Sequence, residues 1–426
     1  MKKYSVLIVL MVCTLLMCGC DADGGETLQE PTPVATPEPS LELSPELPPE
    51  LISEPTPEPT PEPTPEPEAK EIELGVAMNG EDLPQLCDRN MLTKLNFIAG
   101  TEIELESNGE KISSLYVIWD NVPAEWTLLV DGREVVCGQK GFIHEYIKLE
   151  TPGENVSICV GGEDVLCEIY AFTEGYVPQW VQIWHEPWDN ADLLLFPTHA
   201  DDEHLFFGGM MPYYGGELGL KVQLVYLVNH WKEPPRPHEL LNGLWEVGIT
   251  AYPIIGPFPD LPIDNYQHAR SIYSWDKVVE FQTMILRRFK PSVVVGHDFA
   301  GEYGHGAHIL NAYGLAEAVE KAADPESYCD SAQEYGVWDT PKLYVHRLRE
   351  NQIFLNWETP LEAFGGRTAF EMAEAGFEHH KSQHIWGFHV YDRGEMYDCH
   401  WFGLYRSTVG PDIVGEDIFE NIDAFY

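Results

Sequence analysis

The stretch Leu193–Gly209, LLLFPTHADDEHLFFGG, places a histidine and three consecutive acids between two apolar runs. The run ADLLLF at its start is typical of a buried strand, and the apolar residues after Glu203 predict a helix. Adjacent like charges repel each other, so folding alone gives little reason to put three acids at one turn. Two explanations stay open: the acids lie on a solvated turn, or a cation holds them together.

The sequence that follows alternates between strand and helix patterns. Three further apolar runs predict strands: KVQLVYLVNH (221–230), AYPIIGPF (251–258) and SVVVGHDF (292–299). Apolar residues at helical spacing predict helices over 238–249 and Trp275–Phe289. Such alternation indicates parallel βαβ units, so the predicted fold class is α/β with a doubly wound, mostly parallel sheet. Ligands of such sheets bind at the carboxyl ends of the strands.

Two segments at predicted strand ends carry candidate metal ligands. His199 and Asp202 lie three residues apart on the first turn, where their side chains can converge, while Asp201 projects elsewhere. A catalytic zinc ion needs a third protein ligand, which must come from another strand end. The segment AGEYGHGAHIL (300–310) supplies His305 and His308, both at a helix start and on one helix face. Acids at a helix start also serve as caps, but this joint occurrence favours a metal site.

These motifs resemble a known family. HADDE with the following GG is similar to the AHPDDE signature of the PIG-L/LmbE-like zinc de-N-acetylases, and GEYGHGAH is similar to their GxYGHPDH motif. The resemblance covers residues 188–426. It implies a Rossmann-like fold and the removal of acetyl from N-acetylglucosamine-type substrates. It also implies a zinc cofactor, although a site of two histidines and one aspartate accepts other divalent ions.

The resemblance implies a role for five residues of the metal and catalytic set. His199, Asp202 and His308 match the zinc ligands of the family. Asp201 matches its general base. His305 matches the residue that stabilises the oxyanion and assists the leaving amine.

Two shorter motifs extend the match to the substrate. RPHE (236–239) resembles the segment that provides a substrate-binding arginine, here Arg236. FPD (258–260) resembles the position whose acid binds sugar hydroxyls, here Asp260. Tyr303 matches a mobile tyrosine near the site.

The chain departs from the family at two places. Ala200 stands where the first motif has proline, which relaxes the turn. Ala307 stands where the second motif has an aspartate that can partner the histidine. The protonation state of His305 is therefore open, with Asp298 or Glu302 as candidate substitutes for that partner.

Residues 71–180 predict a small all-β, sandwich-like domain in front of the α/β domain. Short runs such as KISSLYVIWD, EWTLLVDG and EDVLCEIYAF are rich in β-branched and aromatic residues, and turn signals separate them. Trp119 and Trp126 are candidates for stacking on sugar rings, but core packing is the favoured interpretation.

The start of the chain predicts export. Lys2 and Lys3 precede a short apolar run, and LMCGC resembles a bacterial lipobox in which Cys20 would be acylated. Residues 1–20 are thus expected to be a lipoprotein signal peptide, with a plain signal peptide as the alternative. Residues 21–70 are Pro/Glu/Thr-rich and predict a disordered tether. We expect a lipid-anchored protein on the extracellular face of a bacterial cell membrane.

The net charge bears on the class of binding partner, and the cysteine content bears on disulfide bonds. The formal net charge of −45 argues against nucleic acid, because phosphate backbones attract clustered Lys and Arg. An exported protein can form disulfides, and pairs among Cys137, Cys159 and Cys167 are plausible.

The predicted function is that of an exported, metal-dependent hydrolase that removes acetyl from an N-acetylated amino sugar or glycan. One alternative is a surface glycan-binding lipoprotein with an inactive hydrolase domain, and another is a zinc amidase for a non-sugar amide. The later segment EAGFEHHKSQH (374–384) offers His379, His380, Gln383 and His384 as candidates to line the cleft, although structural histidines are the commoner case.

Overall fold

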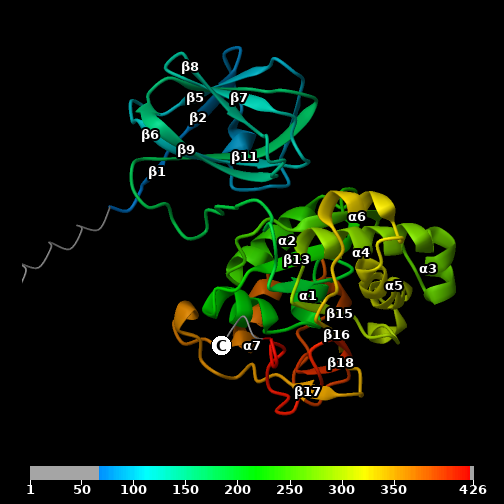
Figure 1. The fold of residues 1–426 in the computed structure, drawn as a ribbon. Helices are drawn as coiled ribbons and strands as arrows, with labels where there is room; N and C mark the ends of the chain where they lie inside the picture. Colours follow the sequence, from blue (N-terminus) through cyan, green and yellow to red (C-terminus); the bar gives the residue numbers. More distant parts are fainter. Residues whose placement is uncertain (1–66, 423–426) are drawn as a thin grey trace, which may run out of the picture. The chain divides into compact units, whose positions relative to one another are not determined.

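The structure is a computed structural model and describes residues 67–422 (Figure 1). The predicted signal peptide with Cys20 and nearly all of the predicted tether lie outside the described residues. Within residues 67–422, none of the helices is both long and apolar enough to cross a membrane.

Seven strands form the sheet in the second half of the chain. They are β12 (Leu193–Leu195), β13 (Val222–Asn229), β14 (Ile254–Pro259), β15 (Val293–Gly296), β16 (Lys342–His346), β17 (Gln352–Phe354) and β18 (Trp401–Ser407). Their order across the sheet is β14-β13-β12-β15-β16-β18-β17. The first five in that order run parallel, and β18 is antiparallel to both β16 and β17.

The first of these strands along the chain, β12, lies between β13 and β15. The chain therefore winds first to one side of β12 and then to the other, which is the pattern of a doubly wound sheet. A crevice opens at the carboxyl ends of the strands where the winding direction reverses. Here that point is the end of β12, where the HADDE segment begins.

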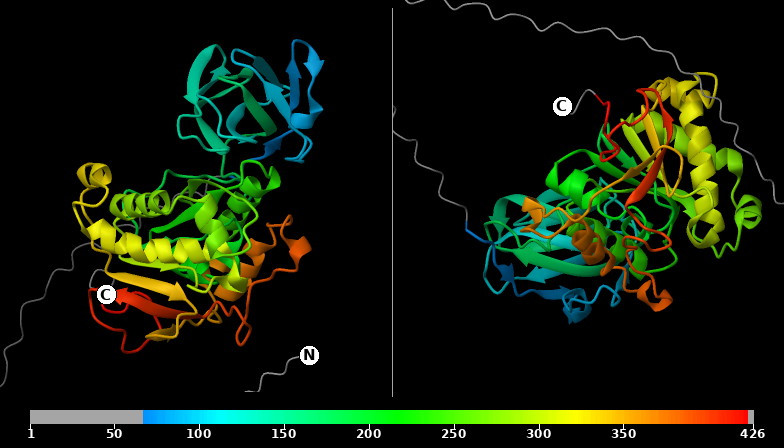
Figure 2. Two further views of the ribbon diagram at one scale, coloured as in Figure 1. Left: turned by 90° about the vertical axis from the view of Figure 1, so that its right-hand side faces the viewer. Right: turned by 90° about the horizontal axis from the view of Figure 1, so that it is seen from below.

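Helices connect the strands. They are α1 (Asp202–Leu205), α2 (Pro235–Glu246), α3 (Tyr266–Ile272), α4 (Trp275–Phe289), α5 (Gly306–Ala323), α6 (Cys329–Tyr335) and α7 (Ala369–Phe377). Helices α4 and α5 pack side by side (Figure 2), whereas α2 and α1 pack against α7. The predicted helix over Trp275–Phe289 has these same bounds.

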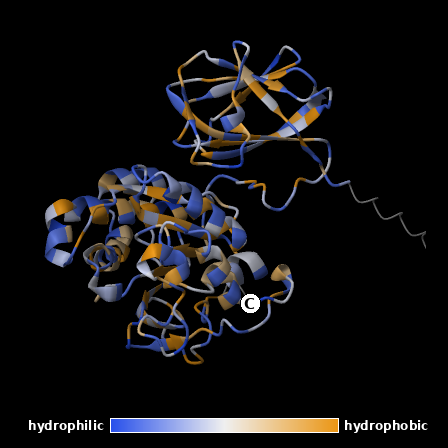
Figure 3. Ribbon diagram, turned by 180° about the vertical axis from the view of Figure 1, so that it is seen from behind, coloured by the Kyte–Doolittle hydropathy of each residue, from blue (hydrophilic) through white to orange (hydrophobic). Residues whose placement is uncertain are grey.

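Strand residues alternate between two cores, one on each face of the sheet. Leu193 and Leu195 belong to the core that contains residues of α1, α2 and α7. Leu194 and Phe196 belong to the core that contains residues of α4 and α5. Burial on both faces explains why β12 and β15 are apolar along their whole length. Figure 3 colours the ribbon by the hydropathy of each residue. The α/β prediction is thus confirmed for this part of the chain.

The helix after Glu203 is much shorter than the apolar run predicts. Helix α1 ends at Leu205, and a π-helical segment, Met211–Glu217, follows a turn at Gly208. Gly208 has a φ of 52°, and a Cβ on it would lie 2.5 Å from Cys399 Sγ. Close packing and a left-handed backbone therefore end the helix at this turn.

Residues 71–172 contain strands in two antiparallel sheets. One sheet comprises β1 (Glu71–Ile72), β4 (Leu95–Phe97), β6 (Ile112–Trp119), β9 (His144–Gly153) and β11 (Asp164–Phe172). The other comprises β2 (Gly75–Met78), β3 (Glu81–Asp82), β5 (Glu102–Glu106), β7 (Trp126–Val130), β8 (Arg133–Cys137) and β10 (Val156–Cys159). Whether this region is a domain with a role of its own stays a prediction.

Trp119 and Trp126 are core residues. Their exposed fractions are 0% and 1%, and their ring centroids lie 5.5 Å apart. Neither ring is open to a sugar, so the structure agrees with the core interpretation.

None of the plausible disulfides among Cys137, Cys159 and Cys167 is formed, since the six cysteines within residues 67–422 are free. Cys137 lies on β8 and Cys159 on β10, and β7 separates these two strands. Strands are about 4.8 Å apart, so these Cα atoms are roughly 10 Å apart, beyond the roughly 7 Å reach of a disulfide. Cys167 lies on β11 in the other sheet.

Candidate active site

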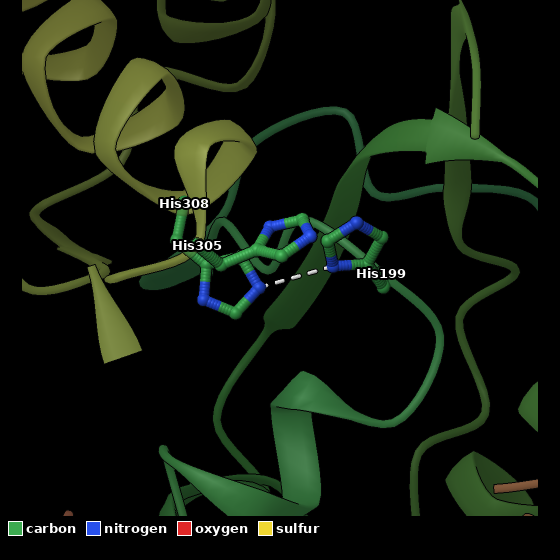
Figure 4. A group of neighbouring side chains, drawn as sticks. All are labelled: His199, His305 and His308. Carbon is green, nitrogen blue, oxygen red and sulfur yellow. Dashed lines mark hydrogen bonds between the residues drawn. The ribbon is translucent and has the colours of Figure 1, made fainter. Parts of the chain in front are cut away.

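Three predicted ligands meet at the end of β12. His199 Nδ1 lies 3.2 Å from Asp202 Oδ2 and 3.0 Å from His308 Nε2, and His308 Nε2 lies 3.3 Å from Asp202 Oδ2. His199 follows β12, whereas His308 is in the first turn of α5, after β15 (Figure 4). The parallel pairing of β12 with β15 brings these two loops together.

This geometry fits a tetrahedral metal ion. Zinc binds nitrogen and oxygen at 2.0–2.2 Å, so two ligands of a tetrahedral site are about 3.3 Å apart. The three separations in the structure are close to that spacing. All three side chains are buried, with exposed fractions of 7%, 1% and 0% for His199, Asp202 and His308. Two nitrogens and one carboxylate oxygen are a donor set that divalent transition metals accept.

The buried carboxylate of Glu302 binds the Nδ1 side of the His308 ring, opposite the Nε2 atom that faces the other two ligands. It lies in a 3-10 turn, Glu302–Gly304, and its Oε2 accepts hydrogen bonds of 2.8 Å from the Nδ1 atoms of His308 and His297. Its Oε1 accepts one of 2.7 Å from His346 Nδ1. Burial alone would raise the pKa of Glu302, but these imidazoles hold it well below its usual range. A carboxylate that orients a metal-binding histidine is a common feature of metal sites.

Asp260 plays a similar part for His199. Its Oδ1 lies 3.5 Å from His199 Nε2, and its Oδ2 lies 3.4 Å from both His230 Nδ1 and Arg236. The residue expected to bind sugar hydroxyls therefore also contacts an expected metal ligand.

Asp201, the expected general base, has a strained backbone. Its φ is 137° and its ψ is −32°, a region that residues with a side chain rarely adopt. Its amide donates a 2.9 Å hydrogen bond to Glu203 Oε2, and its carboxylate lies 3.4 Å from Arg236. Burial raises the pKa of Asp201 well above its ordinary value, against the lowering effect of the Arg236 charge. A raised pKa suits a general base.

His305 stands at the N-terminus of α5 with its ring beside the cluster. Its ring centroid lies 4.8 Å from that of His199 and 4.7 Å from that of His308. Its Nδ1 is buried and has no hydrogen-bond partner among residues 67–422. Burial, with the neighbouring His199 and His308, lowers the pKa of His305 to about 2.

Neither Asp298 nor Glu302 forms a hydrogen bond with His305. Glu302 bonds to His308 instead, and Asp298 pairs with Arg347 at 2.8 Å. The expectation of a replacement partner for His305 is therefore wrong. The reason is local: Ala307 has no carboxylate, and Glu302 points away from His305, toward three other imidazoles.

A pocket of about 350 Å³ opens beside the cluster. Its lining includes all the predicted substrate residues, Arg236, Asp260 and Tyr303, together with Asp201, His199 and His305. Tyr303 is 44% exposed, whereas Arg236 is 6% exposed and donates a 2.7 Å hydrogen bond to the carbonyl of Ala200. Arg236 is therefore held in the wall, and Tyr303 stands at the rim.

Sequence reasoning missed several contributors. His230 and His297 each follow a strand, β13 and β15, and their position at the same sheet edge was a usable signal. Trp386, at the end of the 3-10 turn His384–Trp386, and Phe388, just after it, also line the pocket, and no periodicity in the sequence marks this segment.

The segment 374–384 is only partly at the cleft. Gln383 lines the pocket. His379 instead faces Glu246 at 3.6 Å, His384 lies near the carbonyl of Phe377, and His380 is fully buried beside Glu203.

Searches for similar proteins support the motif resemblance. No protein-family model matches the chain. A 1D-myo-inositol 2-acetamido-2-deoxy-alpha-D-glucopyranoside deacetylase 1 of Catenulispora acidiphila is 28% identical over 189 residues, 38% of this chain and 57% of the relative. A deacetylase 2 of the same name from Saccharopolyspora erythraea is 32% identical, covering 35% of this chain and 63% of the relative. Over part of its length the chain is therefore similar in sequence to deacetylases of a 2-acetamido sugar, which agrees with the motif resemblance.

The match to these deacetylases is partial. The chain spans 57% to 63% of the length of the two relatives above, and 69% of one from Nocardioides at 27% identity. Solved structures with weaker likeness include N,N'-diacetylchitobiose deacetylase from Pyrococcus horikoshii, at 17% identity. That comparison covers 47% of this chain and 75% of the other, with a TM-score of 0.36. The conserved protein TT1542 from Thermus thermophilus scores 0.32 at 19% identity, covering 45% and 80%.

Replacing Glu302 by glutamine should weaken metal binding without touching the pocket. The amide keeps the size of the side chain but loses the charge that orients His308, so we expect a 10–100-fold loss of zinc affinity. Competition with a chelator measures this affinity. Unchanged affinity would mean that Glu302 only fills space.

Strain at Asp201 predicts an order of stability between two variants. Both Asp201→Gly and Asp201→Ala lose the carboxylate, but only glycine adopts a φ of 137° without strain. Asp201→Ala keeps a strain of about 1–3 kcal/mol, whereas Asp201→Gly is free of it but has a larger entropy cost on folding. The balance leaves Asp201→Gly more stable by about 1 kcal/mol. Urea unfolding compares the two, and the reverse order would show that the turn is unstrained.

Proposed function

We propose that residues 188–426 form a zinc-dependent deacetylase that removes acetyl from an N-acetylated amino sugar. The observation that carries the proposal is the meeting of His199, Asp202 and His308 around one point, with the Asp201 carboxylate lining the adjoining pocket. The relatives are named for deacetylation of a 2-acetamido sugar, which favours the same substrate class here.

The chemistry divides among the pocket residues. A bound zinc ion supplies a Lewis acid and lowers the pKa of water to about 7. Asp201 takes the proton of the attacking water. His305 donates a hydrogen bond to the oxyanion, an interaction whose loss typically costs about 10²–10³ in rate. The proton then passes to the departing amine, leaving acetate and a free amino sugar.

The pocket suits a sugar. Its volume of about 350 Å³ lies within the usual range of small-ligand sites, about 300–1,000 Å³. Arg236, Asp260 and Glu233 offer charged partners for hydroxyl groups on one side. Trp386, which is 68% exposed, and Phe388 offer flat apolar surfaces for the face of a sugar ring.

Two alternatives differ from this proposal in what the site does. A glycan-binding protein with an inactive hydrolase domain needs no general base, yet Asp201 is present and backed by Arg236. A zinc amidase for a non-sugar amide would keep the same centre but bind another group in the pocket.

Export and lipid anchoring through Cys20 belong to the proposal as well. They rest on the leader motif, which lies outside the described residues, and on the Pro/Glu/Thr-rich segment, nearly all of which lies outside them. The deacetylase would then act on glycans at the outer face of the cell membrane.

The direct test is acetate release from a panel of N-acetylglucosamine compounds and non-sugar acetamides. We expect release only from the sugars, with Asp201→Ala keeping zinc but losing turnover. Asp202→Ala should lose zinc as measured by metal analysis. Acetate release from non-sugar amides alone would favour the amidase. Binding of the sugars without acetate release would favour the glycan-binding protein with an inactive hydrolase domain.

The pH profile should depend on Arg236. Its positive charge lowers the pKa of Asp201, so Arg236→Gln should raise that pKa further. The acidic limb of kcat/KM should then move to higher pH by about one unit, because the base must be deprotonated to act. Arg406→Gln is the control, since Arg406 pairs with Glu320 and Asp339 elsewhere. An unmoved limb would exclude Asp201 as the titrating base.

A further inference from the structure

A second group of metal-type side chains lies outside the pocket. It consists of Glu203 and His204 at the start of α1 and His380 just after α7, and we name it the second cluster. Each of the three residues is fully buried, with an exposed fraction of 0%. None of them is among the residues that line the substrate pocket.

The second cluster holds five polar atoms without a partner. Within residues 67–422, no hydrogen bond reaches Glu203 Oε1, either ring nitrogen of His204 or either ring nitrogen of His380. Buried polar side chains are almost always hydrogen-bonded, so five such atoms in one place need an explanation. Packing alone is a poor one, since apolar residues would fill the same space without the loss of solvation.

The distances within the cluster suit a metal ion. Glu203 Oε1 lies 3.4 Å from His380 Nε2 and 3.6 Å from His204 Nε2. One donor atom from each residue can be chosen so that all three lie within 4.8 Å of one another. Ligands of a tetrahedral zinc ion are about 3.3 Å apart, so a small inward movement would place these three donors around one ion, with the fourth position left for another ligand. Burial lowers the pKa of His380 to about 3, which leaves its imidazole neutral and able to bind metal.

Two glycines make room for the imidazoles. A Cβ on Gly243, inside α2, would lie 2.8 Å from His204 Nε2 and 3.0 Å from His380 Nε2. A Cβ on Gly376, inside α7, would lie 2.2 Å from His204 Cε1. Glycine in a helix interior is costly relative to alanine, so both positions favour the close approach of these rings over helix stability.

We propose that Glu203, His204 and His380 bind a second divalent transition-metal ion, distinct from the one held by His199, Asp202 and His308. Two imidazole nitrogens and a carboxylate oxygen suit zinc, cobalt or iron rather than magnesium or calcium. Because none of the three residues lines the pocket, this ion would not contact the substrate.

The second ion would act on the catalytic turn through Glu203. The other oxygen of that carboxylate, Oε2, accepts the 2.9 Å hydrogen bond from the strained amide of Asp201. An ion on Oε1 would fix the carboxylate and thereby hold the general base in place. Glu203 is thus a positioning residue.

Metal content of the full chain tests the proposal. After loading with zinc and removal of unbound metal, we expect two zinc ions per chain in the unaltered protein. His380→Ala and Glu203→Gln should each retain one, as should His308→Ala, which removes a ligand of the other site. The matched control is His379→Ala, which should retain two, because His379 faces Glu246 and not the cluster.

A zinc-edge anomalous map of the unaltered protein makes the test independent of variant folding. We expect one peak among Glu203, His204 and His380 and another among His199, Asp202 and His308. An ordered water or a direct Glu203–imidazole hydrogen bond in place of the first peak would overturn the proposal, as would two zinc ions in His380→Ala. The outcome does not depend on acetate release, so it is separable from the proposed deacetylase activity.

Discussion

The pairing of β12 with β15 is the constraint on which the site depends. These two strands run parallel and in register over Leu193–Leu195 and Val293–Val295, so the loops that follow them leave the sheet at the same edge. The turn after β12 carries His199 and Asp202, and the segment after β15 leads to His308. This arrangement brings the three donor atoms within 3.3 Å of one another. A slip of one strand by a single residue would move the loop after it by about 3.3 Å and exchange the residues that face the two cores.

Around the three ligands, buried carboxylates lie in contact with imidazole rings. Asp202 and Glu302 are buried carboxylates, and each contacts imidazoles from more than one loop. Asp201 is the exception, because its buried carboxylate has one cation, Arg236, and acidic neighbours on either side. A strained backbone and a buried acid whose pKa is raised thus coincide at the residue expected to do the chemistry, as is common where function opposes stability.

Much of the site followed from the sequence because position relative to strand ends carries the information. His199 and Asp202 could be grouped with the pair His305 and His308 from their places after two apolar runs. The choice of His308 as the third ligand came from the family resemblance. The hydrogen-bond partner of His305 could not be predicted. Whether Glu302 points at residue 305 or at residue 308 depends on a 3-10 turn in which Tyr303 has a left-handed backbone. The short α1 was missed because Gly208 packs on Cys399, a contact made across much of the chain. His380 joins Glu203 only through the packing of α7 on α1 and α2, which no local pattern encodes.

Glu302 has a wider consequence. Its carboxylate joins His297 after β15, His346 at the end of β16 and His308 at the start of α5, so three elements share one anion. An ion bound to His308 would be linked to the order of this whole sheet edge. Ligands that bind only the folded state stabilise it in proportion to the logarithm of their free concentration. The free metal level around the protein would thereby become one of the variables that set its folding equilibrium, and starvation for metal would weaken the fold as well as the activity.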